Sequence, residues 1–262
     1  MSGEGELTFA AAVAAHNRDR EFRPHDHAHE YYQASLLSAV MQGVYDGKLT
    51  IGELLKHGDF GLGTFNALDG EMIVHEGVAY RLTADGKAAR ASDDDLTPYA
   101  AVLPFEPDLS LAVMAPVDKA EFERGLDEIA QSPNLFYAVR FTGRIGHIKY
   151  RNVSRQEPPY KPLLEVVKTQ AEFELEDVSG TILGFRCPDY AVGIGVPGYH
   201  LHFISEDLTT GGHVLNYSLV SGRLEIDHTA SLHLELPDSG SFLDTDIAPG
   251  AAAADIRSAE GE

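Results

Sequence analysis

The stretch PGYHLHFISEDLTTGGHVLNYSL, residues 197–219, contains three histidines in two runs of β-forming residues that a polar, glycine-containing loop joins. Side chains alternate between the two faces of a strand, so His200 and His202 are expected on one face, about 7 Å apart. The loop allows the second run to return beside the first, which brings His213 towards the other two. The pattern therefore predicts a divalent metal held by three imidazoles, with coordination positions left for water or substrate.

The identity of the metal follows only partly from these ligands. All-nitrogen ligation suits Zn²⁺ best, while iron, copper and nickel are compatible with it. The alternative is a hairpin whose histidines face solvent or end a strand. The metal site is favoured because the neighbouring residues have the apolar character of a buried strand: Tyr199, Leu201, Phe203 and Ile204.

A second histidine run lies near the start of the chain, where His25, His27 and His29 alternate in PHDHAHE. Such a run can bind a metal adventitiously. We expect residues 1–29 to form a flexible arm, because they mix alanine and charge without a clear period. This expectation argues against a catalytic metal there.

The charge of the chain excludes several classes of partner. It has 20 Lys and Arg against 41 Asp and Glu, a formal charge of −21, so neither nucleic acid nor an anionic membrane is expected to bind. No run approaches the roughly 20 apolar residues of a spanning helix, and a soluble cytoplasmic protein is expected. The single cysteine, Cys187, excludes an intrachain disulfide and a multi-cysteine zinc site.

The remaining pattern predicts a β-rich protein with a few helices. Helical spacing of apolar residues predicts a helix within residues 30–47 that ends at Gly47, and another over residues 116–132. A short helix is expected to begin at Thr50, with Glu53 completing a capping box. Turn signals such as Asp69-Gly70 and Glu76-Gly77 separate strands elsewhere. Two strands with a glycine between them are expected in residues 135–154.

Four segments together resemble the bacterial α-acetolactate decarboxylase family. They are YYQASLLSAVMQGVYDG, GDFGLGTFNALDGEM, YRNVSRQEPPY and GYHLHFISEDLTTGGHVL, in that order from Tyr31 onwards. The resemblance implies an α+β, β-rich two-domain layered fold with mixed sheets and a few flanking helices, a homodimer, and a cytoplasmic role in making acetoin. We assign residues 30–162 to an N-terminal domain, 163–240 to a C-terminal domain with the histidine hairpin, and 241–262 to a tail that folds back to the active site.

The resemblance also implies the site residues. The family's three zinc ligands match His200, His202 and His213. Its other site residues match Thr64, Glu71 and Arg151 and, in the tail, Glu260, with Glu262 as the alternative for the last position.

The chemistry of these residue types agrees with loss of CO₂ from 2-acetolactate. A Lewis-acid metal stabilises the enediolate that remains, and no organic cofactor is needed. The guanidinium of Arg151 matches a carboxylate in a bidentate manner, and a neutral Glu71 can deliver a proton. The alternatives are a zinc hydrolase or hydratase that uses the same three histidines, and a metal-binding module without catalysis.

Overall fold

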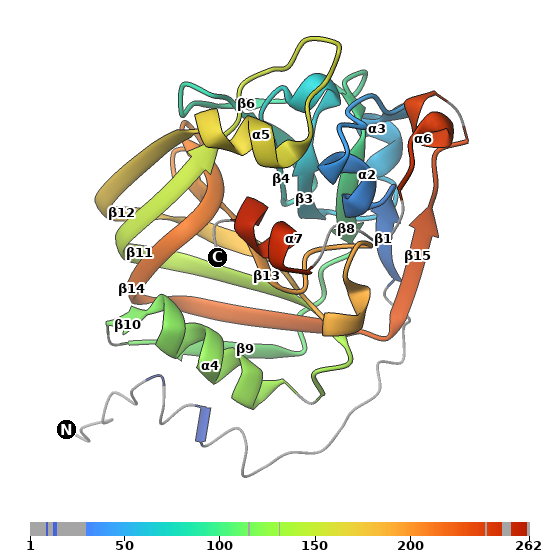
Figure 1. Ribbon diagram of the computed structural model, residues 1–262. Coiled ribbons are helices and arrows are strands. Elements are labelled where there is room, and N and C mark those ends of the chain that lie inside the picture. Colours follow the sequence, from blue (N-terminus) through green and yellow to red (C-terminus); the bar gives the residue numbers. More distant parts are fainter. Residues whose placement is uncertain are drawn as a thin grey trace, which may run out of the picture.

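The computed structural model is β-rich, with mixed sheets and few helices, as the sequence predicts (Figure 1). It describes residues 9, 13–14, 30–114, 116–130, 132–238, 240–247 and 253–260. The predicted arm, including His25, His27 and His29, lies mostly outside the described residues. Phe9 and Val13 are described and buried, and the Phe9 ring stacks on Phe122 at 5.3 Å between ring centroids.

The first sheet has seven strands in the order β15-β1-β8-β3-β4-β5-β6. The bounds are β1 (Glu30–Ala34), β3 (Phe60–Thr64), β4 (Glu71–His75), β5 (Val78–Leu82), β6 (Ala88–Arg90), β8 (Tyr99–Leu103) and β15 (Ser231–Glu235). The sheet is mixed because β15 runs parallel to β1, whereas the other neighbours are antiparallel. The predicted Glu76-Gly77 turn joins β4 to β5, and both residues have positive φ, 51° and 75°.

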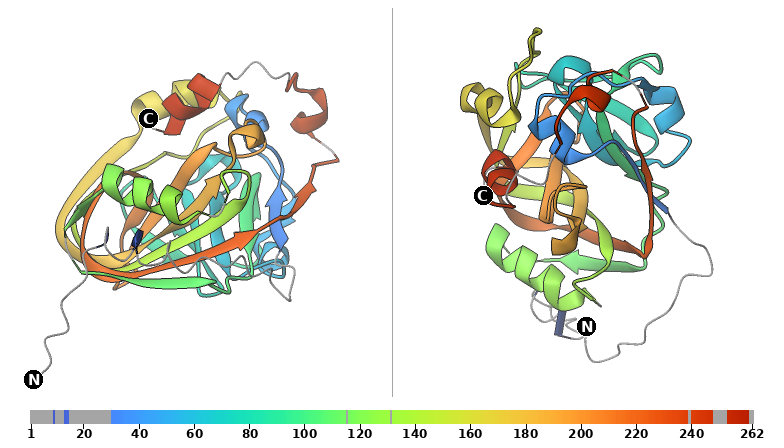
Figure 2. Two further views of the ribbon diagram at one scale, coloured as in Figure 1. Left: turned by 90° about the horizontal axis from the view of Figure 1, so that it is seen from below. Right: turned by 45° about the vertical axis from the view of Figure 1, so that its right-hand side comes forward.

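The second sheet has the order β10-β14-β11-β12-β13, and β9 pairs with β14 as well. The bounds are β9 (Leu109–Val113), β10 (Val117–Asp118), β11 (Phe136–Asn152), β12 (Ala171–Cys187), β13 (Gly198–Ser205) and β14 (Gly211–Thr229). Because β13 also pairs with β14, the four strands β11, β12, β13 and β14 form a closed ring of pairings. Their long strands curve strongly in both views of Figure 2.

The helices are short apart from α4 and α7. They are α2 (Leu37–Met41), α3 (Ile51–Leu54), α4 (Lys119–Ile129), α5 (Leu163–Val166), α6 (Ser241–Asp244) and α7 (Ala253–Glu260), with 3₁₀ turns η1 (Asn66–Leu68), η2 (Val167–Thr169) and η3 (Asp189–Ala191). The capping box of Thr50 and Glu53 at α3 is confirmed, and so is the predicted amphipathic helix, which Asp118 caps. The pair β2 (Leu49–Thr50) and β7 (Leu96–Thr97) forms a separate ribbon. No helix among the described residues is long and apolar enough to cross a membrane.

The helix predicted within residues 30–47 is wrong in its extent. Residues 30–34 form β1, and the helix occupies only residues 37–41. Ser35, with a φ of 65°, separates the two elements, and Gly43, with a φ of 86°, follows the helix. Aromatic residues at positions 31 and 32 favour a strand, and this strand pairs with β8 and β15. The apolar residues at helical spacing begin only at Leu36, after the strand has ended.

The two strands expected in residues 135–154 are one strand of 17 residues, β11. Gly143 does not interrupt it, because this glycine packs against other glycines. It lies opposite Gly180 on β12 and Gly222 on β14, and a Cβ at Gly143 would lie 2.3 Å from the Ser221 carbonyl oxygen. The glycines therefore permit close approach of three strands instead of ending one.

A buried apolar layer joins the two sheets. It contains residues from both, among them Phe60, Ile73, Phe136, Leu183 and Phe185. The change of sheet does not coincide with the expected boundary at residue 162, since the chain enters the second sheet after β8 and returns to the first at β15. The predicted domain limits stay a prediction.

An ion pair fixes the segment where the chain first passes between the sheets. The Asp108 carboxylate lies 2.5 Å from His228 Nδ1 and accepts from the His228 backbone N–H at 2.9 Å. The hydrogen bond to Asp108 raises the pKa of His228 above its usual value, against the opposing effect of burial. The charged pair therefore stabilises the fold.

We expect this pair to make stability depend on pH. A pKa raised by folding gives stabilisation that is complete below the unfolded-state pKa of about 6.5 and is lost as pH rises through the folded-state pKa. Asp108→Asn should remove about 1–3 kcal/mol of unfolding free energy at pH 5.5 and less at pH 9. Urea unfolding of wild type and variant at both pH values measures this loss of unfolding free energy. An equal loss at both pH values would contradict a charged pair of His228 with Asp108.

Candidate metal centre

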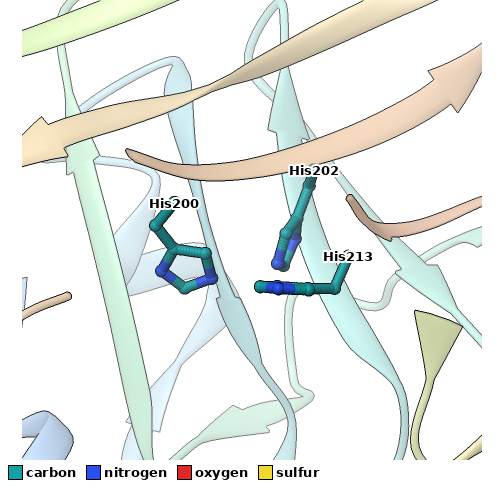
Figure 3. Close-up of side chains that lie close together, drawn as sticks. All are labelled: His200, His202 and His213. Carbon is teal, nitrogen blue, oxygen red and sulfur yellow. The ribbon is translucent and has the colours of Figure 1, made fainter. Parts of the chain in front are cut away.

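The three histidines of the hairpin converge, as the sequence predicts. One ring nitrogen of each lies within 4.8 Å of the others, and the ring centroids are 5.1–5.4 Å apart. All three side chains are buried. Figure 3 shows the rings of His200, His202 and His213 turned towards a common centre.

Strand pairing explains the convergence. His200 and His202 alternate with buried Leu201 along β13, and His202 lies directly opposite His213 on β14. His213 is in turn opposite Arg151 on β11. Three neighbouring strands therefore present the metal ligands and the arginine at one place, although Arg151 is about fifty residues from the hairpin in sequence.

The ring of His202 has the orientation that a metal ligand needs. Its Nδ1 lies 2.7 Å from the Met72 carbonyl oxygen, which accepts only, so Nδ1 carries the proton and Nε2 carries a lone pair. Nε2 is buried and has no hydrogen-bond partner among the described residues. A buried nitrogen without a partner is costly, and a metal ion at the centre of the three rings satisfies it. The residues present therefore fit a divalent metal.

The protonation state of the ligands agrees with this fit. Burial, together with the smaller effect of the positive charge of Arg151, lowers the pKa of His200 to about 3. Burial also holds the pKa of His202 well below its usual value, with repulsion from His200 adding to the effect. Neutral imidazole is the form that binds a metal, so the site is prepared for one at neutral pH.

A buried ion pair lies beside the histidines. Arg151 Nη1 is 3.5 Å from Glu71 Oε1, and the other carboxylate oxygen, Oε2, is 3.9 Å from His202 Nε2. The two side chains are only 4% and 11% exposed. Arg151 Nη2 donates to the Ala259 carbonyl at 3.0 Å, and Nε has no partner among the described residues. One face of the guanidinium fork is therefore available to an anionic ligand.

Thr64 lies across from Glu71 in the pairing of β3 with β4, and its hydroxyl donates to the Gly70 carbonyl at 2.8 Å. Thr64, Glu71, Arg151, His200 and His213 all line one cavity of about 40 Å³. Its other walls are mainly apolar: Leu37, Val40, Gly63, Leu68, Tyr99, Val153 and Leu163. The structure thus brings together the candidate residues from both sheets. The sequence pattern did not identify the apolar wall, whose residues come from separate elements.

The tail returns to the site at helix α7. Ile256 and Ala259 are buried in a cluster with residues of α2 and α5, and the Ala259 carbonyl accepts from Arg151. Figure 1 shows α7, in red, in front of β13, and the left view of Figure 2 shows it beside α5 at the outer side of the sheets. Glu260 is the last residue of α7, next to the carbonyl that Arg151 contacts. Glu262, the alternative for the tail position, lies outside the described residues.

The turn between β3 and β4, residues 65–70, has a strained backbone. Ala67 and Leu68 are left-handed, with φ of 61° and 49°, which costs non-glycine residues about 1–3 kcal/mol each. Gly70 has a φ of 93°, and a Cβ there would lie 2.6 Å from the Leu82 carbonyl oxygen. The predicted Asp69-Gly70 turn is confirmed, and it sets the start of β4 at Glu71.

Comparison with known proteins gives one consistent result. Residues 31–249 match the family model of alpha-acetolactate decarboxylase. The chain is 45% identical over 242 residues to the alpha-acetolactate decarboxylase of Methylococcus capsulatus. This match covers 92% of this chain and 93% of that protein. The Bacillus subtilis enzyme is 41% identical over 88% of this chain and 91% of its own length.

The fold gives the same answer. The crystal structure of alpha-acetolactate decarboxylase from Bacillus subtilis strain 168 superposes with a TM-score of 0.87 and 41% identity, over 89% of this chain and all of that one. Sequence and fold agree over nearly the whole chain, and the three histidines lie together in its core. The chain belongs to the alpha-acetolactate decarboxylase family.

Proposed function

We propose that this chain decarboxylates 2-acetolactate (2-hydroxy-2-methyl-3-oxobutanoate) to acetoin and CO₂, as part of acetoin and 2,3-butanediol biosynthesis. One observation carries the proposal: three buried imidazoles lie together beside a buried arginine and glutamate, and two of them, His200 and His213, line the same cavity as that pair. A metal-binding module without catalysis gains nothing from a buried ion pair, whose desolvation is costly. A catalytic role explains the pair better, because a substrate carboxylate can bind there before it leaves as CO₂.

We propose Zn²⁺ as the metal, held by His200, His202 and His213. When bound, it supplies a Lewis acid for the negative charge that loss of CO₂ leaves on the substrate's carbonyl oxygen. The three-nitrogen ligand set supports zinc among the divalent metals. Treatment with a chelator should abolish CO₂ release from racemic 2-acetolactate, and added Zn²⁺ should restore it. Full activity in metal-free protein would refute a metal-dependent mechanism.

The role proposed for Arg151 is to hold the substrate's carboxylate. Its Nε has no partner among the described residues, and Glu71 and the Ala259 carbonyl fix the other end of the guanidinium group. A group fixed in this way loses little entropy when it binds a carboxylate. The apolar wall of Leu68, Val153 and Leu163 excludes water, which strengthens this charged contact.

The role proposed for Glu71 is proton transfer. Its Oε2 lies on the side of the histidines and its Oε1 on the side of Arg151, so the carboxyl group lies between the metal ligands and the anion-binding group. Once the carboxylate has taken up a proton on Oε2, it can pass that proton to the carbon that has lost CO₂. Thr64, opposite Glu71, is proposed to contact the substrate from the same wall.

Glu260 is proposed as a second carboxyl group at the site. Glu260→Gln should lower kcat about 100-fold or more, the usual range for loss of a general acid or base. Metal content and the thermal midpoint should not change, because Ile256 and Ala259 still dock α7. Steady-state kinetics and elemental analysis measure both.

Glu262→Gln is the matched control and should behave like wild type. Loss of activity in Glu262→Gln with full activity in Glu260→Gln would show that Glu262, and not Glu260, supplies the second carboxyl group. Full activity in both variants would show that no carboxylate of the tail takes part.

A homodimer and a cytoplasmic location are also proposed, on the strength of the family resemblance. Light scattering of the purified protein should give twice the mass of one chain. A monomer at micromolar concentration would contradict the dimer.

A further inference from the structure

The strained turn of residues 65–70 connects two residues of the proposed site, Thr64 and Glu71. Leu68, one of its two left-handed residues, is 2% exposed and forms part of the cavity wall. Consecutive left-handed residues that are not glycine persist only where neighbouring contacts hold them. The residues that hold the turn can therefore affect the site without lining the cavity.

Backbone contacts hold the middle of the turn. The Ala67 N–H donates to the Tyr45 carbonyl at 2.8 Å, and the Gln156 N–H donates to the Ala67 carbonyl at 2.7 Å. The Asn66 amide exchanges two hydrogen bonds with the backbone of Gly47, at 2.8 and 3.0 Å. The turn therefore lies between the segment after α2 and the loop that follows β11.

Asp69 holds the end of the turn through two arginines. Its carboxylate pairs with Arg81 on β5, next to the strand of Glu71, and lies 3.3 Å from Arg155 Nη1. Arg155 follows Arg151 by four residues. Arg81 itself is fixed, since it pairs with Asp95 at 2.9 Å and lies 4.1 Å above the Phe65 ring. One carboxylate thus connects β5, the strand that pairs with the strand of Glu71, to the loop that follows β11.

We propose that Asp69 is a positioning residue for decarboxylation: it holds the left-handed turn so that Leu68 and Glu71 face the cavity and Glu71 stays beside Arg151. Asp69 does not line the cavity, and its side chain is 31% exposed, so it acts through its neighbours. Its ion pairs lie near the surface, where such pairs contribute modestly to global stability, so the effect of Asp69 on activity and its effect on stability can be separated. The inference rests on the proposed function of Glu71 and Arg151.

The test is Asp69→Asn, which keeps the size of the side chain and removes its charge. We expect kcat for 2-acetolactate to fall about ten-fold or more, because the proton-transferring group is displaced, and KM to change less. Metal content should be unchanged. Hydrogen exchange should become faster in the peptides that cover residues 65–72 and 150–157. Asp177→Asn is the control, because it removes the exposed pair of Asp177 with Arg144, far from the site. It should change neither the kinetics nor the hydrogen exchange.

A second substitution separates positioning from loss of structure. Glycine adopts the left-handed conformation without strain, so Ala67→Gly should leave wild-type activity unchanged and should restore most of the kcat of Asp69→Asn. Arg155→Gln, at an arginine that is 58% exposed, should reproduce part of the loss even if Asp69→Asn folds poorly.

Normal kcat and normal exchange in Asp69→Asn would overturn the proposal, and so would a loss that Ala67→Gly does not restore. An inactive wild type would instead refute the proposed function, and the exchange measurement would still decide whether Asp69 holds the turn.

Discussion

His202→Ala is expected to lose both the metal and the activity. The wild type should contain about one metal ion per chain, and the variant close to none, because His202 is the fully buried central ligand and alanine leaves only two imidazoles. We expect CO₂ release from 2-acetolactate to fall by about 10³-fold or more, since the Lewis acid is lost with the metal. Elemental analysis and steady-state kinetics on the same preparation measure the two effects.

His233→Ala is the matched control. The side chain of His233 is 46% exposed and pairs with Glu30 on the first sheet, away from the metal centre, so this variant should keep both properties. A His202→Ala protein with full metal and full turnover would show that the three histidines are not the metal site. The run with His25, His27 and His29 would then be the next place to examine.

Arg151→Lys is expected to keep the metal and lose most of the turnover. Lysine preserves the charge, but one ammonium group cannot contact Glu71, the Ala259 carbonyl and a substrate carboxylate at the positions that the guanidinium fork reaches. We expect kcat/KM to fall by about 10²- to 10³-fold. Arg144→Lys, at an exposed pair with Asp177, is the control and should be neutral.

The metal content of Arg151→Lys decides how its kinetics are understood. Unchanged metal with low kcat/KM supports a direct role in holding the substrate's carboxylate. Normal kinetics would remove Arg151 from the mechanism. Loss of the metal as well would show that Arg151 supports the histidine cluster instead.

The three-histidine cluster could be predicted from the sequence because its geometry is local. The alternation of His200 and His202 fixes a common face, and a short loop fixes the position of His213 on the paired strand. The capping box at Thr50 and the hairpin turn at Glu76-Gly77 were predictable for the same reason, since each depends on residues within a few positions.

Features that depend on distant pairing could not be predicted from the residues alone. The Met72 carbonyl that orients His202 belongs to the other sheet, 130 residues away. Strand β1, which the sequence placed inside a predicted helix, is held by β8 and by β15, which is about 200 residues further along the chain. The left-handed conformation of Ala67 and Leu68 has no sequence signal, because neither residue favours it.

The positions of Thr64, Glu71, Arg151 and Glu260 were implied by family resemblance, whereas local pattern left each of them a plausible surface residue. Burial distinguishes the two interpretations for three of them. As whole residues, Thr64, Glu71 and Arg151 are 5%, 8% and 3% exposed, and they line the cavity with His200 and His213. A buried glutamate and arginine beside metal ligands indicate a functional site more strongly than their sequence context does.

The most direct test is to mix the metal-loaded protein with racemic 2-acetolactate and to measure CO₂ and the chirality of the acetoin formed. We predict equal amounts of CO₂ and acetoin, an excess of one acetoin enantiomer because Glu71 or Glu260 delivers the proton from a fixed direction, and no product above background with His202→Ala. Absence of CO₂ from 2-acetolactate with the metal-loaded protein, together with hydrolysis of simple esters or hydration of CO₂, would contradict the proposed function and favour a zinc hydrolase or hydratase.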